Sequence, residues 1–126
     1  IQARYRETFA DLPGVIFPAI SSAGTTNAWL TCITLEPGVA ALQPDQLRLQ
    51  LEARDIETRP LWKPMHAQPV FRGNPARLDG TADRLFATGL CLPSGSGMSQ
   101  DDLDRVIDAV RAALTKTPIP VSLATG

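Results

Sequence analysis

The sequence lacks the features on which metal, nucleic-acid and membrane functions depend. Its 126 residues include only one histidine and two widely separated cysteines, so no spacing resembles a metal site. The net charge is −1 with both signs mixed, and we expect no nucleic-acid surface. No apolar run approaches the roughly 20 residues that cross a bilayer, and no segment has the order of a signal peptide. We therefore expect a cytoplasmic protein with neither a nucleic-acid nor a membrane partner.

Several motifs of catalytic and phosphate-binding loops are also absent. There is no Gly-x-Gly-x-x-Gly, no phosphate loop with Gly-Lys-Ser/Thr, and no Gly-x-Ser-x-Gly turn for a nucleophile. The stretch Ser94–Gly97 precedes a predicted helix and could offer backbone N–H groups to an anion, although a plain loop is the simpler interpretation. The cluster of Asp101, Asp102 and Asp104 is explained by helix capping without a metal.

The composition is that of one ordinary globular domain. Hydrophobic residues make up 44% and charged residues 20% of the chain, which suits one hydrophobic core. Cys32 and Cys91 lie in apolar stretches. A disulfide between them is possible in principle, but two buried free thiols are favoured because no secretion signal is present.

Patterns of strands and helices alternate along the chain. We expect helices over 2–12, 44–53, 80–88 and from Ser99 to Leu114, and strands over 28–35, 56–59 and 90–92. Ser99 and Asp102 resemble a capping box, and Gly89 is placed to stop the preceding helix. The prediction is an α+β fold (a two-layer α/β arrangement) with a three- to four-stranded sheet and helices packed on one face. The domain is expected to span 1–116, with a tail over 117–126.

The first predicted helix has a sparse apolar stripe formed by Tyr5, Phe9 and Leu12. Because the sequence begins inside this helix, we expect a segment outside the present chain to cover the stripe. If the chain is instead an oligomerisation domain, the stripe pairs with a second copy.

The segment Arg59–Phe71 is unlike the rest of the chain. It places Arg, Trp, Lys, His and Gln between prolines, which restrict the backbone of the residues around them. One interpretation is a rigid loop that presents cationic and hydrogen-bonding groups to an anionic or polar ligand. The other is that Trp62, Met65 and Phe71 fill the core while the charged residues are solvated.

This segment carries a family resemblance. The run Ile56–Phe71, with Gly89–Gly95 and Asp104–Ile107 downstream, resembles the C-terminal region of the DegT/DnrJ/EryC1/StrS family of sugar aminotransferases that depend on pyridoxal phosphate (PLP). The resemblance covers about residues 4–114.

The most specific part of the resemblance is Trp62-Lys63-Pro64-Met65-His66 followed by Gln68-Pro69. It is similar to the branch of the family that acts on 4-keto-6-deoxy sugar nucleotides. Ala67 stands where that branch has a larger apolar residue, a departure that leaves the polar groups in place.

The resemblance implies the small C-terminal domain of a fold-type I aminotransferase, one that uses PLP and transfers an amino group, with glutamate as the expected donor. PLP would be bound by a lysine of a large domain that is absent here. The only lysines are Lys63 and Lys116, and neither matches the family's Schiff-base position. We therefore expect no catalytic, cofactor-binding or metal-binding residue in this chain, and no activity from it alone. The full-length enzyme is expected to be a homodimer in bacterial polysaccharide biosynthesis.

The resemblance also suggests substrate-binding residues. His66 is expected near the active site, where it would hydrogen-bond the sugar or help to order the site. Arg59, Trp62 and Lys63 would shape the entrance or meet the nucleotide diphosphate, which suits Arg and Lys electrostatically. The alternative is a free-standing module that binds nucleotide sugars or oligomerises without catalysis.

Overall fold

The computed structural model describes residues 1–20 and 22–115. In chain order the elements are α1 (Gln2–Thr8), β1 (Val15–Ile16), β2 (Thr31–Leu35), α2 (Pro44–Glu52), β3 (Arg59–Pro60), the 3₁₀ turns η1 (Met65–Ala67) and η2 (Pro69–Phe71), α3 (Thr81–Thr88), β4 (Gly89–Leu92) and α4 (Gln100–Thr115). The tail predicted over 117–126, and Lys116 before it, lie outside the described residues.

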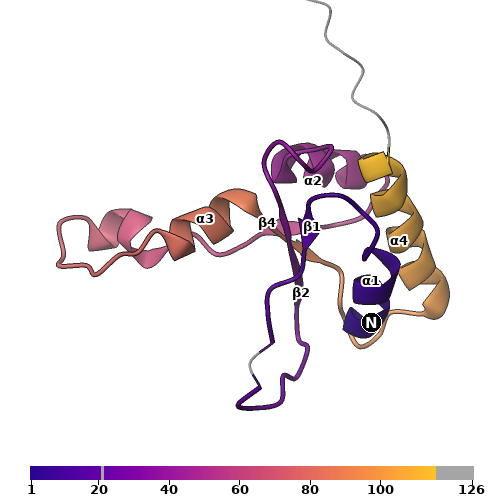
Figure 1. The fold of residues 1–126 in the computed structure, drawn as a ribbon, viewed down its shortest axis with the longest axis horizontal. Coiled ribbons are helices and arrows are strands. Elements are labelled where there is room, and N and C mark those ends of the chain that lie inside the picture. The colour runs from indigo at the N-terminus through magenta and orange to yellow at the C-terminus, as the bar shows by residue number, and fades with distance from the viewer. Residues whose placement is uncertain (21, 116–126) are drawn as a thin grey trace, which may run out of the picture.

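The four strands form one antiparallel sheet in the order β1-β2-β4-β3. Residues of β2 alternate in burial, so that Thr31, Ile33 and Leu35 are buried while Cys32 and Thr34 are half-buried on the opposite face. Helices α1, α2 and α4 gather at one side of this sheet (Figure 1). The predicted α+β class and the sheet of up to four strands are therefore confirmed.

One core lies between the sheet and these three helices. Strand residues Ile33, Leu35, Leu90 and Leu92 meet the apolar stripes of the helices there. The full cluster consists of Tyr5, Phe9, Leu12, Ile33, Leu35, Leu47, Leu51, Ile56, Leu90, Leu92, Leu103, Val106, Ile107, Ala109, Val110, Ala113 and Leu114.

The stripe on α1 belongs to this core and not to an outside partner. Tyr5 is fully buried and Phe9 is 1% exposed, and their rings stack with centroids 5.6 Å apart. The expectation that a missing segment or a second copy covers these residues is wrong, because the chain's own core takes them.

Polar contacts tie α1 to the C-terminal part of the domain. Tyr5 donates a hydrogen bond to the carbonyl of Pro93 at 2.9 Å, and burial raises the pKa of Tyr5 to about 12. Arg111 of α4 donates to both carboxylate oxygens of Asp11, at 2.7 and 2.8 Å, and to the carbonyl of Thr8. The hydrogen bonds from Arg111 lower the pKa of Asp11 to about 2.

Helix starts follow the predicted chemistry closely. Asp102 accepts a hydrogen bond from the backbone N–H of Ser99 at 3.1 Å, and the Ser99 hydroxyl accepts one from the N–H of Asp102 at 3.1 Å. The capping box predicted before α4 is therefore confirmed. Helix α2 begins with a second capping box, formed by Gln43 and Gln46, and Pro44 lies between them in the first turn, where proline was expected.

Three elements differ from the prediction by more than one residue at a boundary, and one strand was missed. Helix α1 ends at Thr8 instead of 12. Strand β2 begins at Thr31, because Ala28 has a positive φ of 50° that does not fit a strand. Strand β3 is Arg59–Pro60 and not 56–59, and proline is tolerated there because β3 is an edge strand. The two-residue strand β1 is too short to give an alternating pattern.

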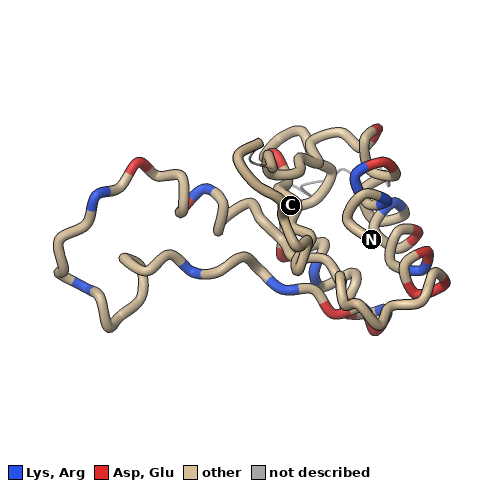
Figure 2. The backbone as a smooth tube through the Cα atoms, turned by 90° about the horizontal axis from the view of Figure 1, so that it is seen from below, with Lys and Arg blue, Asp and Glu red and all other residues tan. Residues whose placement is uncertain are grey.

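Residues 61–88 form an extension that we call the arm. It leaves the sheet after β3, carries η1, η2 and α3, and returns directly into β4, so that it projects away from the helices (Figure 1). Seen from below, it is a long open loop with blue segments along both of its sides (Figure 2). Within the described part of the chain, no helix combines the length and apolarity needed to span a membrane.

Gly89 lies where the arm joins the sheet, and its missing side chain is required there. A Cβ at this position would stand 2.1 Å from Leu61 Cδ1 and 2.5 Å from the carbonyl oxygen of Leu85. We expect Gly89→Ala to lower the free energy of unfolding by about 2 kcal/mol, because backbone atoms must shift. Urea denaturation measures the loss. Gly24→Ala is the control, since nothing lies within 4 Å of its new Cβ; equal losses would contradict the explanation.

Candidate functional site

Three of the four predicted site residues lie on the first half of the arm, which short turns hold in shape, and the fourth, Arg59, lies in β3 just before it. Backbone N–H groups of Ala67 and Gln68 donate to the carbonyls of Pro64 and Met65, both at 3.0 Å, which closes η1. The Gln68 side chain donates to the Lys63 carbonyl at 3.1 Å. Because proline also fixes φ around these turns, the side chains between them are held in a defined order along the arm.

Core filling by this segment is ruled out. Trp62 is 67% and Met65 62% exposed, and Phe71 is only half-buried. None of the three belongs to the core cluster. The interpretation in which they plug the core is wrong, because the arm carries them away from the sheet face that the helices cover.

His66 is fixed by a carboxylate from the returning side of the arm. Its Nε2 lies 2.8 Å from Oδ1 of Asp83 in the first turn of α3. A carboxylate can only accept, so Nε2 carries the proton in this pair and Nδ1 of the neutral ring is left as an acceptor. Asp83 was missed by sequence analysis because it lies 17 positions away and reads simply as a helix-start acid.

Trp62 pairs with a second exposed tryptophan. Its ring lies 6.2 Å from that of Trp29, centroid to centroid, with a tilt of 40°. Trp29 is 69% exposed and follows an Asn27 turn, in which the Asn27 side chain accepts the Trp29 N–H at 3.1 Å. Two adjacent exposed rings form a surface on which a flat or apolar ligand group can pack. No local pattern in the sequence indicates that these tryptophans meet.

The two cations of the predicted set differ in their surroundings. Arg59 is held by Glu57, with Nε and Nη2 donating to the same carboxylate oxygen at 2.9 and 2.6 Å. Lys63 is exposed, and its ammonium makes no ion pair within residues 1–20 and 22–115. Lys63 is therefore the cation that is available to an anion without breaking an existing pair.

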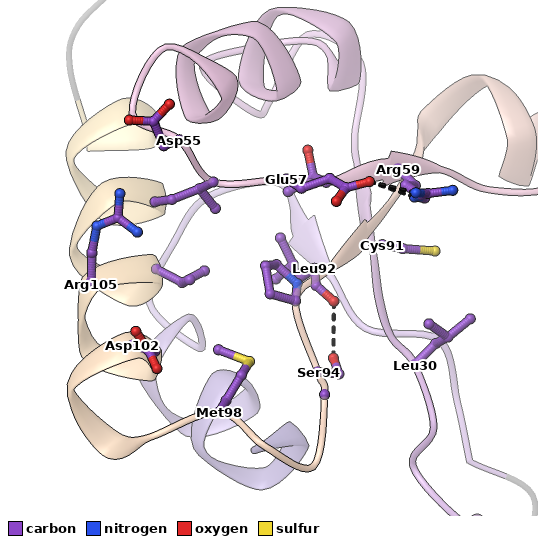
Figure 3. Close-up of a pocket in the computed structure, with 15 residues that line it drawn as sticks. Leu30, Asp55, Glu57, Arg59, Cys91, Leu92, Ser94, Met98, Asp102 and Arg105 are labelled. Atoms are coloured by element: carbon purple, nitrogen blue, oxygen red, sulfur yellow. Dashed lines mark hydrogen bonds and ion pairs between the residues drawn. The ribbon is translucent and has the colours of Figure 1, made fainter.

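A cavity of about 400 Å³ opens between β3, β4 and α4 (Figure 3). Arg59 and Glu57 line its β3 side, and Arg105, which donates to the carbonyl of Arg54, lines its α4 side. Ser94 donates to the carbonyl of Leu92 and accepts from the backbone of Thr31, both at 3.0 Å. Its hydroxyl is thus used inside the fold, which favours the plain-loop interpretation of Ser94–Gly97.

The four predicted residues do not surround a single cavity. Arg59 lines the cavity beside β4, whereas His66 lines a separate one of about 250 Å³ with Met65, Phe71 and residues 74–78. Trp62 and Lys63 lie between them along the chain. The arm therefore presents a row of groups along its surface, and the row suits an elongated ligand held against another surface.

The described residues do not form a site for the PLP that the resemblance implies. That cofactor needs a lysine amine for its Schiff base and donors around its phosphate. Lys63 is exposed on the arm and lines neither of the two cavities described above. In the same described part of the chain, no group of three or more His, Cys, Asp or Glu residues could hold a metal ion.

The sequence of this chain is similar to those of two proteins from bacteria. EpsN of Bacillus subtilis, a proposed pyridoxal phosphate-dependent aminotransferase, is 41% identical over 116 residues, which are 87% of this chain and 29% of EpsN. A GDP-perosamine synthase of Caulobacter vibrioides is 31% identical over 97 residues, 77% of this chain and 26% of that protein.

A solved structure has the same arrangement. DesI, crystallised in the presence of its TDP-sugar product, is 33% identical with a TM-score of 0.78 over 91% of this chain and 30% of DesI. The chain thus spans less than a third of the length of these relatives. The sequence model of one family matches residues 1–111. The chain therefore belongs to the DegT/DnrJ/EryC1/StrS aminotransferase family.

Proposed function

We propose that this chain is the C-terminal small domain of a PLP-dependent aminotransferase that transfers an amino group from glutamate to a 4-keto-6-deoxy sugar nucleotide. The observation that carries the proposal is the arm, which presents His66, Lys63 and Trp62 outside the core with His66 held by Asp83. The names of the relatives, a GDP-perosamine synthase and an enzyme with a TDP-sugar product, support a nucleotide-sugar substrate. A spore coat polysaccharide protein among the relatives supports a place in bacterial polysaccharide biosynthesis.

In this proposal the domain, placed at residues 1–116, shapes an active site whose cofactor belongs to the rest of the protein. PLP there supplies the electron sink for amino transfer. Family membership, together with a chain that spans less than a third of its relatives, supports this division. The chain alone should not transaminate, since neither lysine matches the Schiff-base position. The full-length protein would act as a cytoplasmic homodimer.

Each of the four predicted residues then has a role in binding. Nδ1 of His66 accepts a hydrogen bond from a sugar hydroxyl, while the Asp83 carboxylate holds Nε2. Lys63 meets the diphosphate as an unpaired cation, and Trp62 packs with Trp29 beside the nucleotide. Arg59, in β3 at the base of the arm, shapes the entrance, since Glu57 already binds its guanidinium.

The test uses the full-length parent protein and the present chain side by side. Each is incubated with PLP, glutamate and a panel of GDP- and TDP-linked 4-keto-6-deoxy sugars, and amino-sugar formation is followed by mass spectrometry. We expect product from the full-length protein with at least one keto sugar nucleotide, and none from the chain alone. A full-length protein that aminates only substrates without a nucleotide would overturn the proposal.

Calorimetry separates the enzyme domain from a free-standing binding module. In the proposal the chain alone binds sugar nucleotides weakly or not at all, because the rest of the site is missing. Tight binding by the chain alone would favour the module. An inactive full-length protein with tight binding would do the same.

A further inference from the structure

Two cysteines face each other across the central strands. Cys32 of β2 and Cys91 of β4 are direct partners in the antiparallel register, and their sulfurs are 3.6 Å apart. Residues opposed in this way have Cα atoms about 4.5 or 5.5 Å apart. Both separations fall within the roughly 4.4–6.8 Å that a disulfide spans. The sheet therefore already holds both backbones where a disulfide needs them.

Only the side chains have to move for a bond to form. A disulfide has an S–S length of about 2.05 Å, so the sulfurs must approach by about 1.5 Å. Rotation about χ1 moves a sulfur by this amount without shifting the strand. Both thiols are free in the structure, as the sequence favoured, but Cys32 is half-buried and not fully buried.

The pair lies on the sheet face that the core does not use. Neither cysteine belongs to the core cluster, although their strand neighbours Ile33, Leu90 and Leu92 do. Figure 3 shows the Cys91 sulfur directed away from α4, at the wall of the cavity that Arg59 also lines. A small reagent therefore reaches Cys32 first and Cys91 behind it.

We propose that Cys32 and Cys91 form a reversible disulfide by exchange with a low-molecular-weight disulfide of the glutathione class. In the first step the Cys32 thiolate attacks one sulfur of the reagent, giving a mixed disulfide and one reduced thiol. In the second step Cys91 loses its proton to water and attacks Cys32, which releases the second reduced thiol. Two protein thiols are oxidised, and one reagent disulfide is reduced to two thiols.

The order of the steps follows from the surroundings of the two sulfurs. Burial and the hydrogen bond to Cys32 raise the pKa of Cys91 to about 12. Cys91 is therefore a poor first nucleophile near neutral pH, and closure of the protein disulfide is the slow step. The rate of closure should rise with pH as long as burial keeps the Cys91 thiol mainly protonated, since the thiolate fraction rises with pH.

The cysteine pair also lies beside the strand from which the arm leaves the sheet. Cys91 is paired on its other side with Arg59 of β3, the strand from which the arm leaves. A disulfide would fasten β2 to β4 directly beside this strand. Oxidation would thus act next to a residue of the predicted substrate entrance, while the reduced pair leaves the two strands without a covalent link.

The test incubates the chain with glutathione disulfide and follows free thiols, intact mass and a non-reduced peptide digest. We expect both thiols to disappear, the mass to fall by two hydrogens, and one linked peptide pair containing Cys32 and Cys91. Dithiothreitol should reverse all three changes. A wild-type chain that stops at a stable glutathione adduct, forms only intermolecular links, or does not react would overturn the proposal.

Single variants test the order of reaction. Cys91→Ser should trap a stable glutathione adduct on Cys32, whereas Cys32→Ser should slow the loss of the remaining thiol at least about tenfold. Oxidation should raise the thermal midpoint of the wild-type chain by on the order of 10 °C, because the link closes a long loop in the unfolded chain. The double serine variant should show no shift. Because the digest of the wild-type chain is decisive by itself, the proposal does not depend on the variants folding.

Discussion

On the proposed function, replacing His66 with alanine in the full-length protein should lower kcat/KM for the keto sugar nucleotide by about 10- to 100-fold, the loss of one hydrogen bond in a desolvated site. The carboxylate of Asp83 holds Nε2 at 2.8 Å, and Nδ1 of the neutral ring is left as an acceptor for a sugar hydroxyl. The loss should be confined to the sugar half-reaction. The half-reaction with glutamate should keep its rate, because glutamate carries no sugar for His66 to contact.

Comparing the two half-reactions distinguishes a substrate contact from a structural role. A His66→Ala protein that merely distorts the domain would slow both half-reactions together. Asp83→Ala should give a smaller loss of the same kind, since the ring stays but is no longer oriented. Asp101→Ala removes the same charge from the start of α4 and should change neither. Stopped-flow rates with glutamate and with the sugar nucleotide give the comparison.

Replacing Phe9 with alanine should lower the free energy of unfolding of this chain by about 4 kcal/mol. The ring is 1% exposed, and it lies between Tyr5 and Phe17, with centroids at 5.6 and 6.4 Å. Its removal loses apolar burial and leaves a cavity that two rings cannot fill without moving. A loss of this size is a large part of the roughly 5–15 kcal/mol that holds a typical domain folded.

Phe71→Ala is the matched control for this change. It deletes the same atoms from a half-buried position on the arm, outside the core cluster. We expect a loss below about 1.5 kcal/mol from urea denaturation. Similar losses at the two positions would mean that the arm and the core unfold as one equally packed unit, contrary to the structure.

The core of this domain could be predicted from the sequence because its signals are local. Leu103, Val106 and Val110 repeat at helical spacing after a capping box, and all are buried in α4. The apolar residues of β2 and β4 likewise lie in runs of strand-forming residues that end at turn-forming residues. A helix or strand with a strong apolar periodicity or a capping motif can be predicted from one short stretch of chain.

The missed features all depend on contacts between distant residues. Strand β1 has two residues and exists because Val15 and Ile16 pair with the end of β2. Asp83, the partner of His66, is 17 positions away, and no local pattern indicates this pairing. Cys32 and Cys91 are 59 positions apart, and the sequence allows a link between them without showing that two strands bring them together. Substrate-binding residues were proposed from a family motif, and their surroundings became visible only in the fold.

The packing of α1 against α4 has a consequence for the order in which this domain folds. Arg4 of α1 pairs with Asp104 of α4, and Tyr5 bonds to Pro93, a carbonyl 88 positions later. Contacts of such long sequence separation form slowly, because a large loop must close before they contribute. During synthesis, α1 leaves the ribosome long before its partner helix exists. The rings of Tyr5 and Phe9, which the folded domain buries, must then stay exposed or be held by a chaperone until the residues of α4 up to Leu114 have been synthesised.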